Sequence, residues 1–146
     1  MLPTFNTGSE VGYGATIASL AAFAIIKDVV INISPGNPLI SEVVAINVLA
    51  GITGSASGGL TIALAALGDT YSQLAQSENI PLEWMHRLAS MASGGFDSLP
   101  HNGAVITLLT ICGLSHKQSY KDIAVVSLVI PVIIVFSMAL LLSWLI

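Results

Sequence analysis

Charged residues are scarce in this sequence. Only 8% of the 146 residues are Asp, Glu, Lys or Arg, whereas 54% are hydrophobic, and an ordinary soluble domain has about 25% charged residues. The shortage argues against a water-soluble globule and favours a protein embedded in lipid. Four basic residues and 6% aromatics provide neither the positive patch nor the stacking surface of a nucleic-acid-binding protein. We therefore expect membrane lipid as a partner and no nucleic acid.

Cysteines and catalytic motifs are also nearly absent. Cys112 is the single cysteine, so neither an intrachain disulfide nor a cysteine-based metal cage can form. Asp97 and His101 are not accompanied by a second catalytic carboxylate, a Ser/Lys pair or the His-Glu-x-x-His spacing. We expect no enzyme activity, hence no catalytic residue, and neither a metal nor a cofactor.

The uncharged runs between the few charges predict an all-α integral membrane fold. Residues 11–33 are predicted as one spanning helix, with Lys27 and Asp28 near a membrane interface. Residues 123–146 contain no charge and exceed the roughly 20 apolar residues that a spanning helix needs. They are predicted as the C-terminal spanning helix, kinked at Pro131.

Glycine interrupts the uncharged stretch between Glu42 and Asp69. Four glycines and three hydroxyl residues occupy positions 51–59, and each interior glycine costs a helix about 1 kcal/mol relative to alanine. An arm over 39–51 would rise only about 20 Å, less than the roughly 30 Å hydrocarbon core. We therefore predict a re-entrant helical hairpin over 39–67, with its tip inside the protein at membrane depth. The alternative is a continuous helix that uses Gly54-x-x-x-Gly58 as a close-packing face.

A second interruption lies within residues 84–114, where Gly94, Gly95, Pro100 and Gly103 fall close together. These residues predict two half-helices separated by an unwound break, in other words a broken transmembrane helix. His86 and His116 lie beside charges at the predicted interfaces and are expected to be solvated.

Two polar segments suggest an orientation. Residues 69–83 carry acids without a basic residue, and residues 115–122 have a basic excess through Lys117 and Lys121. Both segments are predicted as loops. The positive-inside rule places the lysines in the cytoplasm and the acidic segment outside.

The two interruptions carry the candidate chemistry. Unwound backbone in a bilayer needs protein or water to satisfy it, and the N-terminus of a half-helix attracts anions. The hydroxyls and amides at the tip suit a carboxylate. Asp97 and His101 are the only ionisable residues between Arg87 and His116, and burial favours the neutral form of an acid, as a proton carrier requires. The alternative is that Asp97 caps a half-helix and His101 donates to a backbone carbonyl.

The predicted substrate-binding residues are Thr53, Gly54, Ser55, Ser57, Gly58, Ser98 and Asn102, and the predicted proton-coupling residues are Asp97 and His101.

Three runs of this sequence resemble a known family. They are GITGSASGG (51–59), ASMASGGFDSLPHNGAVITLL (89–109) and the following CGLSHKQSYKDI. Together they look like the C-terminal part of the gluconate permease family, proton-coupled symporters of gluconate and related sugar acids or hydroxy acids. The resemblance implies a multi-pass transporter of the inner (plasma) membrane with two inverted repeats, each containing a re-entrant hairpin and a broken helix.

That resemblance also implies partners. They are gluconate or a similar carboxylate substrate, protons, the N-terminal half of the permease that this sequence lacks, and a second copy in a homodimer. The function expected is secondary active transport by proton symport, as a permease or a part of one. The alternative is a truncated, non-transporting membrane fragment or a small helix-packing membrane subunit.

Overall fold

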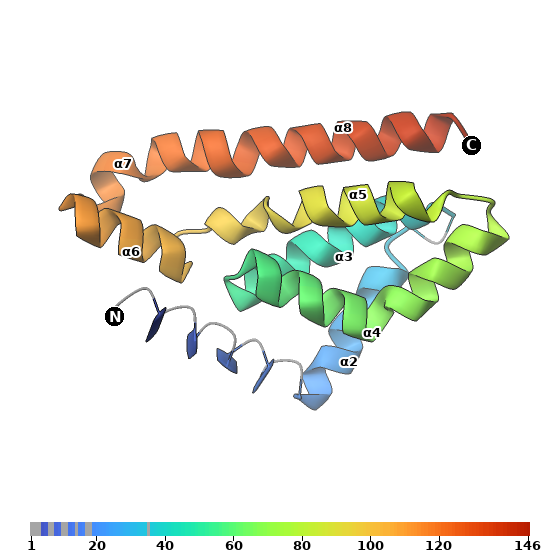
Figure 1. Ribbon diagram of the computed structural model, residues 1–146, viewed down its shortest axis with the longest axis horizontal. Helices are drawn as coiled ribbons and strands as arrows, with labels where there is room; N and C mark the ends of the chain where they lie inside the picture. Colours follow the sequence, from blue (N-terminus) through green and yellow to red (C-terminus); the bar gives the residue numbers. More distant parts are fainter. Residues whose placement is uncertain (1–3, 6–7, 10–11, 14, 17–18, 35) are drawn as a thin grey trace.

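The protein is built from helices that run mostly along one axis (Figure 1). The computed structural model describes residues 4–5, 8–9, 12–13, 15–16, 19–34 and 36–146, and every regular element among them is helical, which confirms the all-α prediction. In chain order the elements are α2 (Ala21–Ile31), α3 (Pro38–Thr53), α4 (Ala56–Ser77), α5 (Leu82–Ser93), the 3₁₀ turn η1 (Phe96–Ser98), α6 (Gly103–Cys112), α7 (His116–Ile123), the π-helical segment η2 (Ala124–Val129) and α8 (Ile130–Trp144).

The N-terminal helix α2 is shorter than predicted. It begins at Ala21, because Leu20 has an extended backbone, although the described residues 12–13 and 15–16 are helical. Its 11 residues rise about 16 Å, roughly half of a hydrocarbon core. The prediction of one continuous helix over 11–33 is therefore wrong at Leu20, and positions 11, 14, 17 and 18 lie outside the described residues.

Helices α3 and α4 form an antiparallel hairpin (Figure 1). The chain reverses at Gly54, whose φ of 64° ends α3 in the left-handed conformation, and Ser55 then caps α4. A continuous helix through Gly54-x-x-x-Gly58 is thereby excluded, because L-residue helices do not continue through that conformation. The break is also narrower than the glycine content suggested, since α3 includes Gly51 and α4 includes Gly58 and Gly59.

The second arm of the hairpin is longer than predicted. Residues 69–77 were expected in an aqueous loop, but α4 continues to Ser77. Every fourth residue from Gly59 to Ala75 is buried, namely Gly59, Ala63, Leu67, Tyr71 and Ala75. That spacing keeps one narrow face of α4 on the core while the polar residues lie on the other faces, so the helix does not need to stop at Asp69.

The second predicted interruption is present. Helix α5 ends at Ser93, the 3₁₀ turn η1 follows two glycines, and α6 starts after Asn102. The side chain of Asn102 caps α6, and Gly113 ends it with a φ of 65°. These are the two half-helices expected within 84–114; their placement in a membrane stays a prediction.

The C-terminal helix begins earlier than predicted. Helix α7, η2 and α8 form one 29-residue helix from His116 to Trp144, and among the described residues it is the one helix long and apolar enough to cross a membrane. Residues 116–122 are therefore helical rather than a loop, because Ser115 and Gln118 form a reciprocal capping box. The π-helical turns before Pro131 widen the helix where the proline ring would meet a preceding carbonyl.

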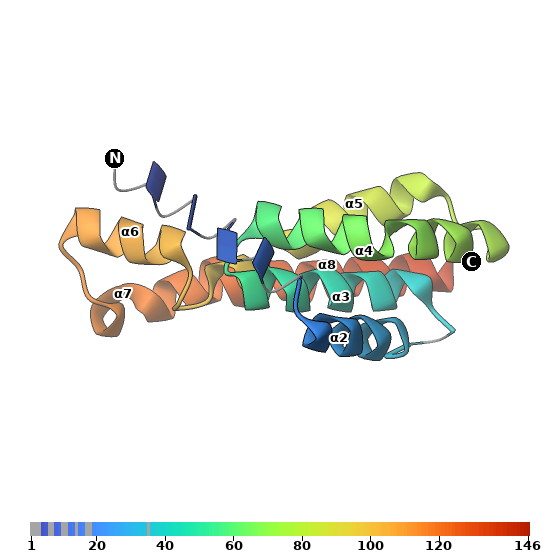
Figure 2. The ribbon, with the colours of Figure 1, turned by 90° about the horizontal axis from the view of Figure 1, so that it is seen from below.

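Helix α3 packs against α4 and α5, which also contact each other, and it contacts α2 and α8 as well (Figures 1 and 2). It is buried along most of its length. Near the tip, α3 and α4 come so close that a Cβ atom on Gly59 would lie 2.4 Å from the Ala50 Cα atom. Glycine at 59 therefore sets how tightly the hairpin closes.

Candidate functional site

The hairpin tip and the break in the second helix meet, and Asp97 joins them. One carboxylate oxygen, Asp97 Oδ1, accepts a hydrogen bond from the Ala56 N–H at 2.7 Å. The same oxygen accepts one from Asn102 Nδ2 at 2.9 Å. Ala56 is the first residue of α4, so the carboxylate lies at the positive end of that helix. Of the two roles considered for Asp97, the structure shows a helix cap, but on α4 rather than on the half-helix that follows Pro100.

Asn102 holds the tip, the break and α6 together. Its side chain is 1% exposed. The Oδ1 atom accepts from the Ala104 N–H at 2.6 Å and from the Val105 N–H at 3.2 Å, which caps α6. The Nδ2 group donates to Asp97 and to the Gly54 carbonyl oxygen. The buried Asn102 amide thus forms hydrogen bonds with backbone groups of both the hairpin tip and α6.

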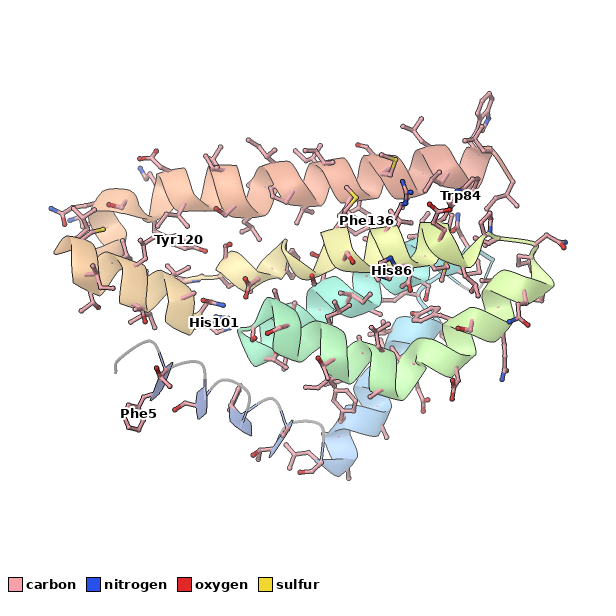
Figure 3. All side chains as sticks on the ribbon, in the orientation of Figure 1. Phe5, Trp84, His86, His101, Tyr120 and Phe136 are labelled. Carbon is pink, nitrogen blue, oxygen red and sulfur yellow. The ribbon has the colours of Figure 1, made fainter. Side chains whose placement is uncertain are left out.

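His101 faces the hairpin tip (Figure 3). Its Nε2 atom lies 2.9 Å from the Gly51 carbonyl oxygen, and because a carbonyl oxygen only accepts, Nε2 carries the proton and donates. The ring also lies next to Gly54, with Cδ2 3.6 Å from the position a Cβ atom would take there. The expected donation from His101 to a backbone carbonyl is therefore present, and it leaves Nδ1 as the acceptor nitrogen of the neutral ring.

An open pocket of about 400 Å³ adjoins this junction. Thr53, Gly54 and His101 line it among the predicted residues. The Thr53 hydroxyl donates to the Leu49 carbonyl oxygen at 2.8 Å, so it bonds back to α3. Sequence reasoning missed the other lining residues, which are Ser9, Tyr13, Gly103 and Ile106.

The remaining predicted residues are not in the lining of this pocket. Ser55 Oγ accepts from the Gly58 N–H at 3.1 Å, so both residues serve the N-terminus of α4. Ser57 is exposed, with its Oγ atom 3.4 Å from that of Ser55. The Ser98 carbonyl oxygen accepts from the Tyr120 hydroxyl at 2.9 Å. The structure thus gathers Thr53, Gly54, Asp97, His101 and Asn102, and leaves Ser57 and Ser98 at the margin.

Helix α7 donates two hydrogen bonds to the unwound break between α5 and α6, a contact that the sequence did not predict. Besides the Tyr120 bond, the exposed His116 donates from Nε2 to the Pro100 carbonyl oxygen over 2.9 Å. Both bonds satisfy carbonyl groups that an unwound segment would otherwise leave unpaired.

Glu42, which is buried in α3 at 3% exposure, was also not singled out from the sequence. Its signal was its isolation, as the only charge between Asp28 and Asp69.

The donor set at the junction suits an anion more than a metal. Within the part of the chain that the structure describes, no group of three or more His, Cys, Asp or Glu side chains is placed to hold a metal ion. The junction offers instead the N-terminus of α4 and a histidine ring beside an open pocket. Backbone N–H groups at a helix N-terminus are general anion ligands.

Comparison with known proteins finds one informative relative. The chain is 51% identical over 129 residues to a protein of Bacillus subtilis (strain 168) named uncharacterized transporter YxjC. The match covers 88% of this chain but only 27% of that relative, so the chain spans about a quarter of its length. No protein-family model matches the sequence, and no solved structure matches it.

Proposed function

We propose that this chain forms part of a membrane transporter that carries gluconate or a related sugar acid or hydroxy acid together with protons. The relative named as a transporter and the long apolar helix His116–Trp144 support a membrane location and a role in transport. The observation that carries the finer proposal is the placement of Asp97 on the N-terminus of α4, next to an open pocket lined by His101.

The geometry suggests how a proton and an anion would bind together. The ionised Asp97 carboxylate occupies the Ala56 N–H, which is the group a substrate carboxylate would bind. Protonation removes the negative charge and weakens Asp97 as an acceptor, so the helix N-terminus becomes free for a second anion. The substrate carboxylate then replaces the Asp97 carboxylate at that end of α4, and local charge is conserved. Binding of the anion therefore requires the proton, which is the condition for symport.

His101 and Asn102 have supporting roles in this proposal. Asn102 keeps the break against the tip while Asp97 changes partners, because it also bonds Gly54 and caps α6. His101 lines the pocket, where its ring is proposed to accept a hydrogen bond from a substrate hydroxyl or to act as a second proton carrier. Partners in this proposal are the carboxylate substrate, protons, lipid and the rest of the permease, with a homodimer as the assembly.

The experiment is uptake of labelled gluconate into proteoliposomes that contain the product of the complete reading frame encoding this chain. Acid outside should accelerate uptake by the unmodified protein. In Asp97→Asn the neutral amide cannot be protonated, so the pH gradient should no longer drive uptake, while exchange of internal for external substrate continues. Asp122→Asn is the matched control, because Asp122 is an exposed acid on α7. Gradient-driven uptake that survives in Asp97→Asn would refute the assigned role.

The alternative of a non-transporting fragment or helix-packing subunit is tested in the same assay. Proteoliposomes containing only residues 1–146 show whether this chain moves substrate by itself. Exchange by the complete reading frame but not by these residues indicates that the site needs further chain. Absence of gluconate exchange and of exchange of other sugar acids by both preparations would contradict the proposed transport.

A further inference from the structure

A second cavity shares no lining residue with the pocket beside the tip–break junction. It has a volume of about 250 Å³ and is bounded by α3, α4 and α5. Most of its lining is apolar, including Leu60, Leu64 and Met85. Its polar groups are the side chains of Glu42, Tyr71, Ser72, His86 and Ser90.

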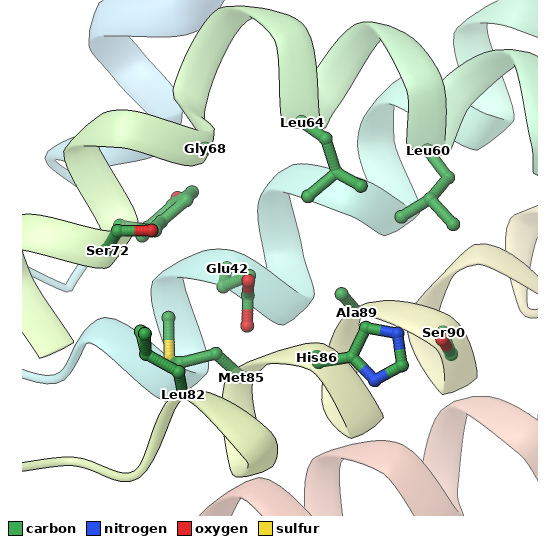
Figure 4. Close-up of a pocket in the computed structure, with 11 residues that line it drawn as sticks. Glu42, Leu60, Leu64, Gly68, Ser72, Leu82, Met85, His86, Ala89 and Ser90 are labelled. Atoms are coloured by element: carbon green, nitrogen blue, oxygen red, sulfur yellow. The ribbon is translucent and has the colours of Figure 1, made fainter.

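Glu42 is the unusual member of this lining. Its side chain is 3% exposed, and its Oε2 atom is buried without a hydrogen-bond partner among the described residues. Figure 4 shows the carboxyl group directed from α3 toward the Met85 and His86 side of the cavity. Buried carboxylates are normally paired or hydrogen-bonded, because removing a charge from water is costly. An unpaired buried oxygen therefore indicates a bound proton or a ligand.

The surroundings favour a proton over a metal ion. A bound Ca²⁺ ion typically needs six to eight oxygen ligands, and Glu42 is the only carboxylate in this lining. The Tyr71 hydroxyl is already engaged, 3.0 Å from Ser41 Oγ. A protonated carboxyl group, by contrast, carries no charge and needs only a small polar space. We propose that Glu42 is a proton-binding site in this cavity, separate from Asp97 and His101.

The titratable groups around Glu42 can be named element by element. Helix α4 presents Tyr71 and α5 presents the exposed His86 to the cavity. Helix α8 contains no ionisable side chain, and η1 carries Asp97, which is bound to the hairpin tip. On α2, Asp28 is exposed. His86 is therefore the one imidazole in this lining, and its exposure places it between the cavity and the surface.

A proton on Glu42 has a structural consequence. While the carboxyl group is neutral, α5 can remain packed on the hairpin, because no charge is confined between them. Loss of the proton would place a negative charge in an apolar cavity, which favours water entry and separation of α5 from α3 and α4. The contact between the hairpin and α5 thus depends on proton occupancy. This inference concerns the site itself and does not depend on transport.

The test uses dicyclohexylcarbodiimide, an apolar reagent that adds to protonated carboxyl groups. The protein in lipid nanodiscs is treated over a range of pH, and modification of Glu42 and of Glu83 is followed by peptide mass. Glu83 is the matched control, because it is an exposed glutamate on α5 that pairs with Arg87. We expect modification of Glu42 to persist to a pH at least about one unit above that at which modification of Glu83 stops. Equal profiles for the two residues would overturn the proposal.

Two variants make the result specific. Glu42→Gln should lose the modification at this position and retain a folded, monodisperse protein, because glutamine resembles the neutral acid in shape. His86→Asn replaces the neighbouring imidazole with an amide that takes up no proton, and Glu42 should still be modified above the pH range of Glu83. If the His86→Asn profile instead falls to that of Glu83, the proton belongs to the histidine, and the assignment to Glu42 is wrong. The unmodified protein gives the decisive profile even if a variant does not fold.

Discussion

The two hairpin arms approach so closely at Gly59 that adding a single methyl group there should destabilise the fold. A Cβ atom at position 59 would lie 2.4 Å from Ala50 Cα, 2.5 Å from Ala50 N and 2.9 Å from the Leu49 carbonyl carbon. Non-bonded carbon atoms prefer a separation of about 3.5–4.0 Å, so the arms must separate by about 1 Å or more. All three atoms belong to the backbone of a buried helix and cannot turn aside as a side chain would.

The magnitude follows from two opposing effects. Overpacking of this kind costs about 1–3 kcal/mol, and backbone overlap places Gly59→Ala at the upper end of that range. Alanine regains about 1 kcal/mol of helix propensity. Gly59→Ala is therefore expected to lower the free energy of unfolding by about 2 kcal/mol in total. Gly68→Ala, on the same helix with nothing within 4 Å of its Cβ position, should gain up to about 1 kcal/mol.

The assay is the free energy of unfolding of both variants in the same detergent or nanodisc, by denaturant or thermal titration. Both variants gain the same helix propensity, so this contribution cancels when they are compared. A difference of about 3 kcal/mol between their free energies of unfolding then reports only the close approach of α3 and α4 at Gly59. Gly59→Ala should also reduce substrate exchange, because separation of the arms displaces the N-terminus of α4, where the substrate carboxylate is proposed to bind. Equal stability of the two variants would show that the arms are not this close.

Two further predictions address the junction and the orientation. Asn102→Ala should lower the free energy of unfolding by about 3 kcal/mol, because a helix cap and two hydrogen bonds between segments are lost. The control Asn32→Ala removes one exposed local hydrogen bond and should change the free energy of unfolding by less than about 0.5 kcal/mol. Similar losses in the two variants would contradict the role of Asn102. In a Cys112→Ser background, an impermeant maleimide added outside intact cells should label Glu78→Cys and not Lys117→Cys. Helix α7 and the α4–α5 connection lie at opposite ends of the molecule (Figure 1), so labelling of both positions would refute the predicted orientation.

The interruptions were predictable because the residues that cause them act locally. Gly54 adopts a left-handed conformation at the tip. Gly94, Gly95, Pro100 and Asn102 all lie between the end of α5 and the start of α6. The extents of the neighbouring helices were not predictable in the same way. Residues 69–77 are polar enough for a loop, yet α4 continues through them, because Tyr71 and Ala75 find a buried surface on the core.

The candidate site was predicted only in part, because its side chains are visible in the sequence and their backbone partners are not. Asp97, His101 and Asn102 are recognisable as polar residues in an unwound segment of an apolar stretch. Their partners are the Ala56 N–H and the carbonyl oxygens of Gly51 and Gly54. Backbone groups carry no residue-specific signal, so only the packing of the tip against the break reveals them. Ser57 and Ser98 have hydroxyl groups of the expected type, but neither residue lines the pocket.

The sequence by itself determined the helical class, the apolar C-terminal helix, the two interruptions and the residue types available at them. These follow from composition, periodicity and the conformational limits of glycine and proline, which are properties of short segments. The tertiary structure decided that Asp97 caps a helix 41 residues away in the chain and that Glu42 faces a cavity closed by α5. Both depend on contacts between distant segments, where a buried polar atom must find a partner or remain without one.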